Sequence, residues 1–189
     1  MPKVIKDAEK TIKNCATELF VEYGYLKVDI RMISAKSKIA VGTLYHYYQS
    51  KKQLYFEILN ESWEKTFIKL DTISIDDIPS EEKLRKYIIV LYEDMEQRKG
   101  LGKFIFDDSL EELKDDIQFN DLKKRMFFKV ENVLKGFQKT EVLNKCAEID
   151  FKLAMTLLVS ITVMQVYYTK EKTENINYLT ELVNLSIKC

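Results

Sequence analysis

Apolar residues recur at alternating spacings of three and four along most of the chain, which is the period of one face of an α-helix. The repeat begins with Ile5, Ala8, Ile12, Cys15 and Leu19. The 189 residues include only 5 Gly and 2 Pro, the residues that most often interrupt helices. No segment of useful length alternates apolar and polar residues as a half-buried strand does. The sequence therefore predicts an all-α fold of about nine helices.

Capping signals divide the first sixty residues into helices. A long helix over 5–23 is expected to end at Gly24, because glycine readily adopts the left-handed conformation that closes helices. Two short helices are predicted at 29–37 and 40–48, separated by a brief turn. The sequence Ser-Lys-Lys-Gln at 50–53 matches a capping box and is expected to open a second long helix.

The rest of the chain is also predicted to be helical. Its clearest break is at 76–80, where Pro79 disfavours helix in the preceding residue. A helix of about five turns is expected between this break and Gly100. The acidic segment 107–116 is expected to be a solvated connection. Further helices are expected at 119–143, 148–170 and 174–188.

The net charge is zero, but basic and acidic residues are unevenly distributed along the chain. Residues 1–60 contain ten Lys or Arg and six Asp or Glu, whereas the other 129 residues contain 20 and 24. Such a split is typical of a chain whose basic end binds a polyanion. A solvated surface gives the same count, so the charge alone leaves both interpretations open.

Few residues are available for metal or redox chemistry. Cys15, Cys146 and Cys189 are odd in number and far apart, which fits a reducing compartment without disulfides. His46 is the one histidine and no Cys-x-x-Cys pair is present, so neither a zinc site nor a His-based catalytic triad is expected. The first residues lack the apolar segment of a signal peptide. We therefore expect a cytoplasmic protein with no metal or cofactor.

One uncharged segment, Leu153–Thr169, has 17 residues, which is the lower limit for a membrane-spanning helix. Its polar residues include Thr156, Ser160, Thr162 and Gln165. These favour a buried or interface helix over a membrane span, and no membrane partner is expected.

Two short helices joined by a tight turn within a basic segment indicate a helix-turn-helix. In this motif the second short helix enters the major groove of DNA and its first residues face the base edges. Residues 40–43, Ala-Val-Gly-Thr, are small enough for close approach, and Val41 and Thr43 offer methyl contacts to thymine. Leu44 and Tyr48, four residues apart, are predicted to point inward.

The segment Gly42-Thr43-Leu44-Tyr45-His46-Tyr47-Tyr48-Gln49-Ser50-Lys51-Lys52-Gln53-Leu54 resembles a signature of the TetR family of transcriptional regulators. That signature is Gly-Thr-Leu-Tyr-x-Tyr-Phe-x-Ser-Lys-x-x-Leu, with Tyr48 here in the Phe position. Residues 18–25, Glu-Leu-Phe-Val-Glu-Tyr-Gly-Tyr, resemble the end of that family's first helix. The resemblance covers about residues 7–60.

The resemblance implies a dimeric repressor with two domains. Residues 1–50 are expected to form a three-helix DNA-binding domain, and residues 51–189 an effector-binding and dimerisation domain. The family pattern places Thr43, Tyr45 and His46 at DNA-contacting positions and Lys51 at a phosphate-contacting position. The full predicted DNA-binding set is Arg31, Lys36, Lys38, Ala40, Val41, Gly42, Thr43, Tyr45, His46 and Lys51.

Two positions depart from the family pattern. Lys38 stands in the turn where the family usually has Gly, and a left-handed lysine is strained by about 1 kcal/mol. Ala40 stands at the helix N-cap where the family usually has Ser or Thr, and alanine forgoes a cap worth about 1 kcal/mol. A side chain that normally bonds a phosphate is therefore missing, which shifts the expected DNA affinity onto the nearby lysines.

The last two expected helices are apolar beyond one face. Pairing with a second copy of the chain would bury them and would place two recognition helices on a pseudo-palindromic operator. The same residues suit a core within one chain, so both interpretations stay open. The residues expected at the homodimer interface are Leu153, Leu157, Leu158, Ile161, Met164, Leu179, Leu182 and Val183.

The middle helices contain many aromatic residues, which line apolar ligand sites but more often form core. Trp63, Tyr87 and Phe128 are the residues predicted to bind an effector. Few charges fall on the inward faces, which favours an unidentified small effector that is apolar or amphipathic.

Three classes of function remain open on the sequence alone. A ligand-responsive DNA-binding repressor is favoured. An enzyme is disfavoured, because no set of nucleophile, base and orienting residue is visible. A helical interaction protein that has lost DNA binding is the third, motivated by Lys38 and Ala40.

Overall fold

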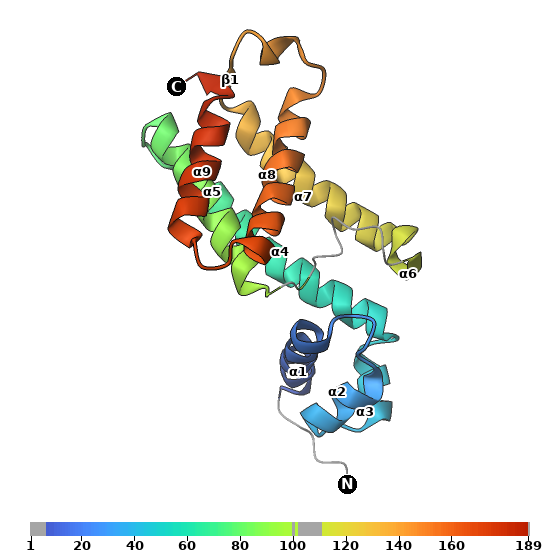
Figure 1. The fold of residues 1–189 in the computed structure, drawn as a ribbon. Helices are drawn as coiled ribbons and strands as arrows, with labels where there is room; N and C mark the ends of the chain where they lie inside the picture. Colours follow the sequence, from blue (N-terminus) through green and yellow to red (C-terminus); the bar gives the residue numbers. More distant parts are fainter. Residues whose placement is uncertain (1–6, 100, 102–110, 189) are drawn as a thin grey trace. The chain divides into compact units, whose positions relative to one another are not determined.

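The computed structural model describes residues 7–99, 101 and 111–188 (Figure 1). The expectation of an all-α fold is confirmed, since helices make up nearly all of its regular structure. A two-residue antiparallel pairing, in which Gln138 faces Lys188 and Lys139 faces Ile187, joins β1 to β2. The helices are α1 (Ala8–Tyr23), α2 (Ile30–Ser37), α3 (Val41–Tyr47), α4 (Lys51–Ile75), α5 (Ser80–Gln97), α6 (Glu111–Lys114), α7 (Ile117–Lys135), α8 (Ile149–Tyr167) and α9 (Lys172–Asn184). The strands are β1 (Gln138–Lys139) and β2 (Ile187–Lys188), and a 3-10 turn spans Leu143–Lys145.

The chain forms two compact units. Unit 1 is Met1–Ser62 with Arg98–Gly102, and unit 2 is Trp63–Gln97 with Lys103–Cys189. By packing, unit 1 extends past residue 50 because the first turns of α4 bury Leu54 and Tyr55 in its core. The functional domain boundary after residue 50 stays a prediction.

Unit 1 contains α1, α2, α3 and the first part of α4. The aromatic rings of Phe20, Tyr25 and Tyr55 pack together, with centroids of Phe20 and Tyr55 at 4.9 Å and of Tyr25 and Tyr55 at 4.8 Å. Leu44 and Tyr48 are 1% and 2% exposed, which confirms that they point inward. These contacts fix α3 by one face and leave its other face in solvent.

Local capping explains where the helices of unit 1 begin and end. The Asp29 carboxylate accepts a hydrogen bond from the Met32 amide at 2.8 Å, as an N-cap does. Ser50 Oγ accepts from the Gln53 amide at 3.1 Å, and the Gln53 side chain accepts from the Gln49 amide at 2.8 Å. Gly24 has φ of 79° and donates its amide to Phe20 O, so a glycine is required there. The predicted caps at Asp29 and Ser50 and the predicted end at Gly24 are therefore confirmed.

Unit 2 is a bundle in which α7 packs against α8, and α5 packs against both α8 and α9 (Figure 1). Its core includes Leu70 from α4, Leu84 and Ile88 from α5, Met126 from α7 and Leu158 from α8.

Helix α7 ends at Lys135, which corrects the expectation of a helix over 119–143. The buried Lys139 ammonium donates to the carbonyls of Leu134 and Phe137 and pairs with Asp150. A lysine bound to the last carbonyls closes the helix, because those carbonyls have no partner further along α7. Gly136, the C-cap directly after Lys135, is a local signal for this helix end that the sequence reasoning missed.

The acidic segment is only partly a connection. Residues 107–110 lie outside the described residues, whereas Glu111–Lys114 forms α6. Asp116 accepts from the amides of Gln118 and Phe119 at 3.0 and 3.3 Å and so caps α7. The solvated connection expected at 107–116 therefore contains a short helix in its second half, where Lys114 and Asp115 are exposed.

Candidate nucleic-acid interface

The turn between α2 and α3 has the left-handed geometry that the sequence indicated. Lys38 has φ of 56° and ψ of 28°. Ser34 Oγ donates to the carbonyl of Ile39 at 2.7 Å, and the Ile39 side chain is buried. The hydrogen bond from Ser34 and the burial of Ile39 thus both fix the turn, and these contacts offset the backbone strain at Lys38.

Helix α3 begins without a side-chain cap. Ala40 offers only its carbonyl, which accepts from the amides of Thr43 at 2.9 Å and Leu44 at 3.0 Å. The side chains of Val41, Thr43, Tyr45 and His46 are all exposed, and so is Ala40. The surface that the sequence predicted as a base-reading face is therefore open to solvent along α3.

Gly42 lies within this exposed face. A Cβ placed on it would meet no atom within 4 Å. The packing of the chain therefore does not require glycine at this position, although glycine weakens a helix by about 1 kcal/mol relative to alanine. The packing of this chain therefore does not explain why position 42 is a glycine, and a contact with another molecule would explain it.

The predicted cations divide into two groups. Arg31 and Lys38 are exposed, and no ion pair joins them to another of the described residues. Lys36 pairs with Glu18 at 2.9 Å, and that hydrogen bond raises the pKa of Lys36. The Lys51 ammonium donates to the carbonyl of Tyr25 at 2.9 Å and lies 4.1 Å from the centroid of its ring. Arg31 and Lys38 are thus the more available partners for an anion.

Tyr48 occupies the position where the family signature has Phe. Its buried hydroxyl has no hydrogen-bond partner within the part of the chain that the structure describes. Burial raises the pKa of Tyr48 to about 12. The hydroxyl therefore contributes a desolvation cost without a compensating bond.

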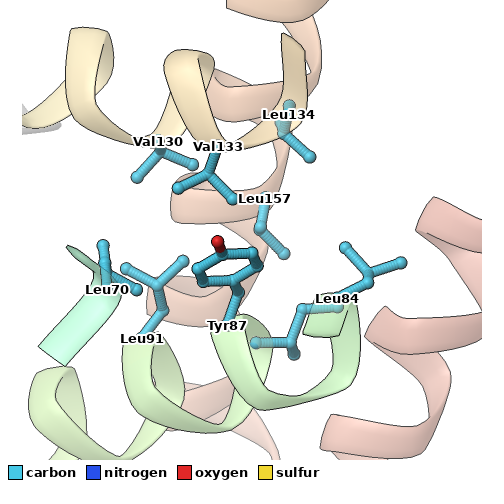
Figure 2. A pocket seen from close by; sticks show the side chains of 9 residues that line it. Leu70, Leu84, Tyr87, Leu91, Val130, Val133, Leu134 and Leu157 are labelled. Atoms are coloured by element: carbon cyan, nitrogen blue, oxygen red, sulfur yellow. The ribbon is translucent and has the colours of Figure 1, made fainter. Parts of the chain in front are cut away.

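Unit 2 contains an apolar cavity of about 10 Å³, which is room for about one water molecule (Figure 2). Figure 2 shows the Tyr87 ring at its centre, between side chains of α5, α7 and α8. The Tyr87 hydroxyl is 2.9 Å from Ser74 Oγ. The lining residues are Leu70, Leu84, Tyr87, Ile88, Leu91, Val130, Val133, Leu134 and Leu157.

Of the three predicted effector residues, the structure places only Tyr87 at this cavity. Trp63 is buried elsewhere, with its ring 5.9 Å from that of Phe67. Phe128 is 59% exposed, because two residues beyond the buried Met126 the helix has turned its side chain to the opposite face. The roles of Trp63 and Phe128 in binding an effector stay predictions, and neither side chain lines this cavity.

The residues expected at a dimer interface are largely core of the same chain. Leu157, Leu158, Ile161, Leu179 and Val183 are buried. Leu153, Met164 and Leu182 are half-buried. In the single chain these residues are covered by α5, α7 and the α8–α9 contact, and their role in a dimer stays a prediction.

The opposite face of α8 is apolar and exposed. Helix α8 has no single polar face and, by length and composition alone, is long and apolar enough to cross a membrane. The exposed apolar side chains of α8 are Phe151, Met155, Val159, Val163, Val166 and Tyr167. Phe151, Met155, Val159 and Val163 are spaced by four residues, so they form one stripe.

Sequence reasoning missed several polar contacts that α4 makes within each unit. Tyr87 contacts Ser74 as described. Thr66 Oγ1 donates to the Asp94 carboxylate at 2.8 Å. Arg98, directly after α5, donates from Nε to Ser62 Oγ at 2.8 Å and from Nη2 to Ser62 O at 3.0 Å. Polar residues at these spacings look like solvated positions in the sequence, whereas Thr66, Asp94 and Arg98 are buried in the structure.

No group of three His, Cys, Asp or Glu side chains suited to a metal ion is found among residues 7–99, 101 and 111–188.

Comparison with known proteins agrees with the fold and the motif. Residues 14–58 match the model of the family described as bacterial regulatory proteins, tetR family. The chain is 33% identical over 95 residues to the uncharacterized HTH-type transcriptional regulator YuxN of Bacillus subtilis (strain 168). That match covers 50% of this chain and 33% of YuxN. The chain thus spans about a third of the length of the curated relative.

Two solved structures share the fold over nearly the whole chain. The fatty acid degradation regulator FadR from Bacillus halodurans has a TM-score of 0.72 and 19% identity, and 96% of each chain is covered. AibR, solved in complex with isovaleryl coenzyme A and operator DNA, has a TM-score of 0.71 and 16% identity. Here 95% of this chain and 100% of AibR are covered. At these identities the likeness shows the fold, and the family match is carried by residues 14–58, which are similar to the tetR family of bacterial regulatory proteins.

Proposed function

We propose that this protein regulates transcription by binding double-stranded operator DNA through α3. The observation that carries the proposal is the division of α3 into a buried and an open face. Leu44 and Tyr48 anchor it, while Val41, Thr43 and His46 stand in solvent. An anchored helix with free polar and methyl groups at its start is suited to read base edges in the major groove.

The exposed cations position the protein on the DNA backbone and do not determine which sequence it prefers. Arg31 and Lys38 lie exposed near the two ends of α2. Contacts of such side chains with phosphates release counterions and favour all sequences equally. Specificity is then expected from α3, and non-specific affinity from these charges.

The protein acts as a homodimer on a pseudo-palindromic operator, with a second copy covering the exposed face of α8. Met155, Val159 and Val163 form an apolar stripe that lies in solvent in the single chain. Twofold pairing would bury the stripe against its own copy, and the two recognition helices would then read two half-sites. This face replaces the interface expected from the sequence.

The regulator is a repressor that a small apolar or amphipathic effector releases from DNA. The cavity around Tyr87 supports this, because its lining is apolar apart from one hydroxyl. The cavity is too small for an organic ligand as it stands, so binding requires its walls to move apart. AibR, which shares the fold, was solved with isovaleryl coenzyme A, and an apolar acyl group would suit this lining. A DNA-binding role places the protein in the cytoplasm.

Selection of binding sites from random duplex DNA tests the proposed function. The full chain should enrich an inverted repeat, and gel shifts with that repeat should give tighter binding than a scrambled duplex of equal length. The specific complex should be tighter by at least about 10³-fold at physiological salt. Recovery of random sequences, with equal affinity for both duplexes, would contradict the proposal.

A further inference from the structure

Four charged side chains of unit 1 converge between α1 and the N-terminal half of α4. The Lys13 ammonium of α1 lies 3.0 Å from a Glu9 oxygen and 3.4 Å from a Glu57 oxygen, and it also donates to Glu61. Glu9 and Lys13 are four residues apart on α1, and Glu57 and Glu61 are four apart on α4, so each pair shares one helix face. We name these four residues the Lys13 clamp, and all of them belong to unit 1.

The clamp contains three carboxylates and one ammonium. The Lys13 side chain is 16% exposed, whereas the three carboxylate side chains are between 40% and 56% exposed. Burial lowers the pKa of Lys13, but its hydrogen bonds with Glu61 and Glu9 outweigh burial and raise the pKa overall. A single exposed ion pair contributes little, whereas a shared cation holds together three acids that would otherwise repel one another. Loss of the Lys13 charge would therefore leave three like charges facing one another across α1 and α4.

Hydrogen bonds connect the clamp to the end of α3. Glu57 Oε2 faces Lys13, while Glu57 Oε1 accepts from the Gln53 side-chain amide at 3.4 Å. The Gln53 side chain accepts in turn from the Gln49 backbone amide at 2.8 Å. Gln49 directly follows Tyr48, whose amide donates to the Leu44 carbonyl at 2.9 Å and closes α3. The clamp is thus bonded, through Glu57 and Gln53, to the backbone at which α3 ends.

The Tyr48 side chain also lies beside the clamp. Burial is the main cause of its raised pKa, the charges of Glu57, Glu9 and Glu61 raise that pKa further, and the charge of Lys13 lowers it. These charges are therefore close enough to act on the Tyr48 hydroxyl. Because Tyr48 is one of the two residues that anchor α3, a change in the clamp changes the support of the helix that carries the candidate DNA-reading face.

Building on the proposed function, we infer that Lys13 is a positioning residue for DNA recognition, which fixes α4 against α1 and so holds α3 in the orientation that reads bases. Base contacts require close geometry, whereas phosphate contacts favour all sequences equally. Loss of the clamp should therefore reduce the discrimination between sequences more than it reduces the affinity for DNA in general.

The measured quantity is the ratio of affinities for the selected operator and for a scrambled duplex of equal length. Lys13→Gln in the full chain should lower this ratio by about 10-fold, whereas Lys13→Arg, which keeps the charge, should stay within about 3-fold of the parent. A partly unfolded protein, or a protein that lacks one phosphate contact, would bind both duplexes more weakly by the same factor. The ratio therefore distinguishes positioning of α3 from loss of stability or of charge.

A double-mutant cycle tests whether Lys13 acts through α4. The pair Glu57→Gln/Glu61→Gln removes the α4 side of the clamp without leaving unbalanced charges, and it should lower the ratio by about 3-fold. In that background Lys13→Gln should lower the ratio further by less than about 3-fold. Lys10→Gln is the matched control, because it removes the same charge from an exposed position on α1 and should leave the ratio unchanged.

Circular dichroism and thermal melting must show each variant folded at the assay temperature. If Lys13→Gln does not fold, the pair Glu57→Gln/Glu61→Gln is measured alone, and an unchanged ratio for this pair would overturn the inference.

An unchanged ratio for a folded Lys13→Gln variant would also overturn it, because Lys13 would then affect only charge or stability. So would a full 10-fold loss in the Glu57→Gln/Glu61→Gln background, since Lys13 would then act without α4. Each of these results leaves the proposed function standing, which fails only if the parent chain does not distinguish an operator from the scrambled duplex.

Discussion

At some positions in unit 1, the residue that would give the most stable fold differs from the residue expected to favour DNA binding. Gly42, Lys38 and Tyr48 are each less favourable to the folded chain than a simple alternative would be. Gly42 weakens a helix, Lys38 occupies a left-handed conformation, and Tyr48 buries an unpaired hydroxyl. Substitutions at these positions therefore separate residues that serve the fold from residues that serve a ligand.

Gly42→Ala should stabilise the protein while weakening operator binding. The added methyl meets no atom of the chain, and alanine is the better helix former by about 1 kcal/mol. In the complex with DNA, the same methyl group would keep the start of α3 from approaching the bases closely. Thermal melting and gel shifts measure the two effects. Asn14→Ala, on the exposed side of α1, is the control that should leave operator affinity unchanged. An unchanged affinity for Gly42→Ala would show that the start of α3 stays away from the bases.

Lys38→Gly should also stabilise the protein, by about 1 kcal/mol, because glycine adopts a φ of 56° without strain. Loss of one phosphate contact in each of the two copies should reduce the slope of log affinity against log salt by about 0.9 per copy bound. Denaturant unfolding and binding at several salt concentrations measure the two quantities. Lys65→Gln in unit 2 is the control for loss of an exposed charge. A salt slope equal to that of the parent would remove Lys38 from the DNA contacts.

Tyr48→Phe should raise the free energy of unfolding by about 1 kcal/mol, because it removes a buried hydroxyl without a partner. The pKa of Tyr48 is raised from 10.0 to about 12 by burial, so above pH 10 the unfolded chain loses this proton before the folded chain does. Stability of the parent therefore falls as the pH rises from 10 to 12, and the variant should lose less over that window. Urea unfolding at pH 7 and at pH 11 checks both parts. A destabilised variant would mean that the hydroxyl has a partner in solution.

At the scale of the elements, the local sequence predicts how helices start better than how they face their neighbours. Asp29 and Ser50 cap helices through their own side chains, so their positions could be predicted from residues a few places apart. The end of α7 also has a local signal, because Gly136 is its C-cap, and the predicted end at residue 143 is too late because it passes over this glycine. The faces of α8 could not be predicted, since a helix without a single polar face has no period that distinguishes core from surface.

Helix α8 gives a prediction about assembly. Val159 is 39% exposed in the single chain, so Val159→Glu should leave the fold intact but place a charge in the proposed interface. The variant is expected to sediment as a folded monomer at micromolar concentration and to bind the operator at least about 10-fold more weakly. Asn132→Glu, on the exposed side of α7, is the control for added charge. A parent protein that is monomeric at that concentration would contradict the interface.

At the scale of the molecule, the sequence predicted the fold class and the candidate DNA-reading surface, whereas the arrangement of unit 2 came from the structure. The motif of unit 1 is local, with Ala40 to Leu54 contiguous in the chain. The cavity joins Leu70, Tyr87, Val130 and Leu157, which are far apart in sequence. Such a site arises from packing, and the aromatic content of a helix does not reveal which rings converge.

The open apolar face of α8 has a consequence for gene dosage. A monomer that binds an operator only after pairing occupies it in proportion to the square of its concentration when the protein is scarce. Halving the expression level then lowers operator occupancy by about fourfold. The exposed stripe of α8 is unfavourable for a single chain. Through dimerisation it would make the regulated promoter respond more steeply to the protein concentration than it would to a monomer.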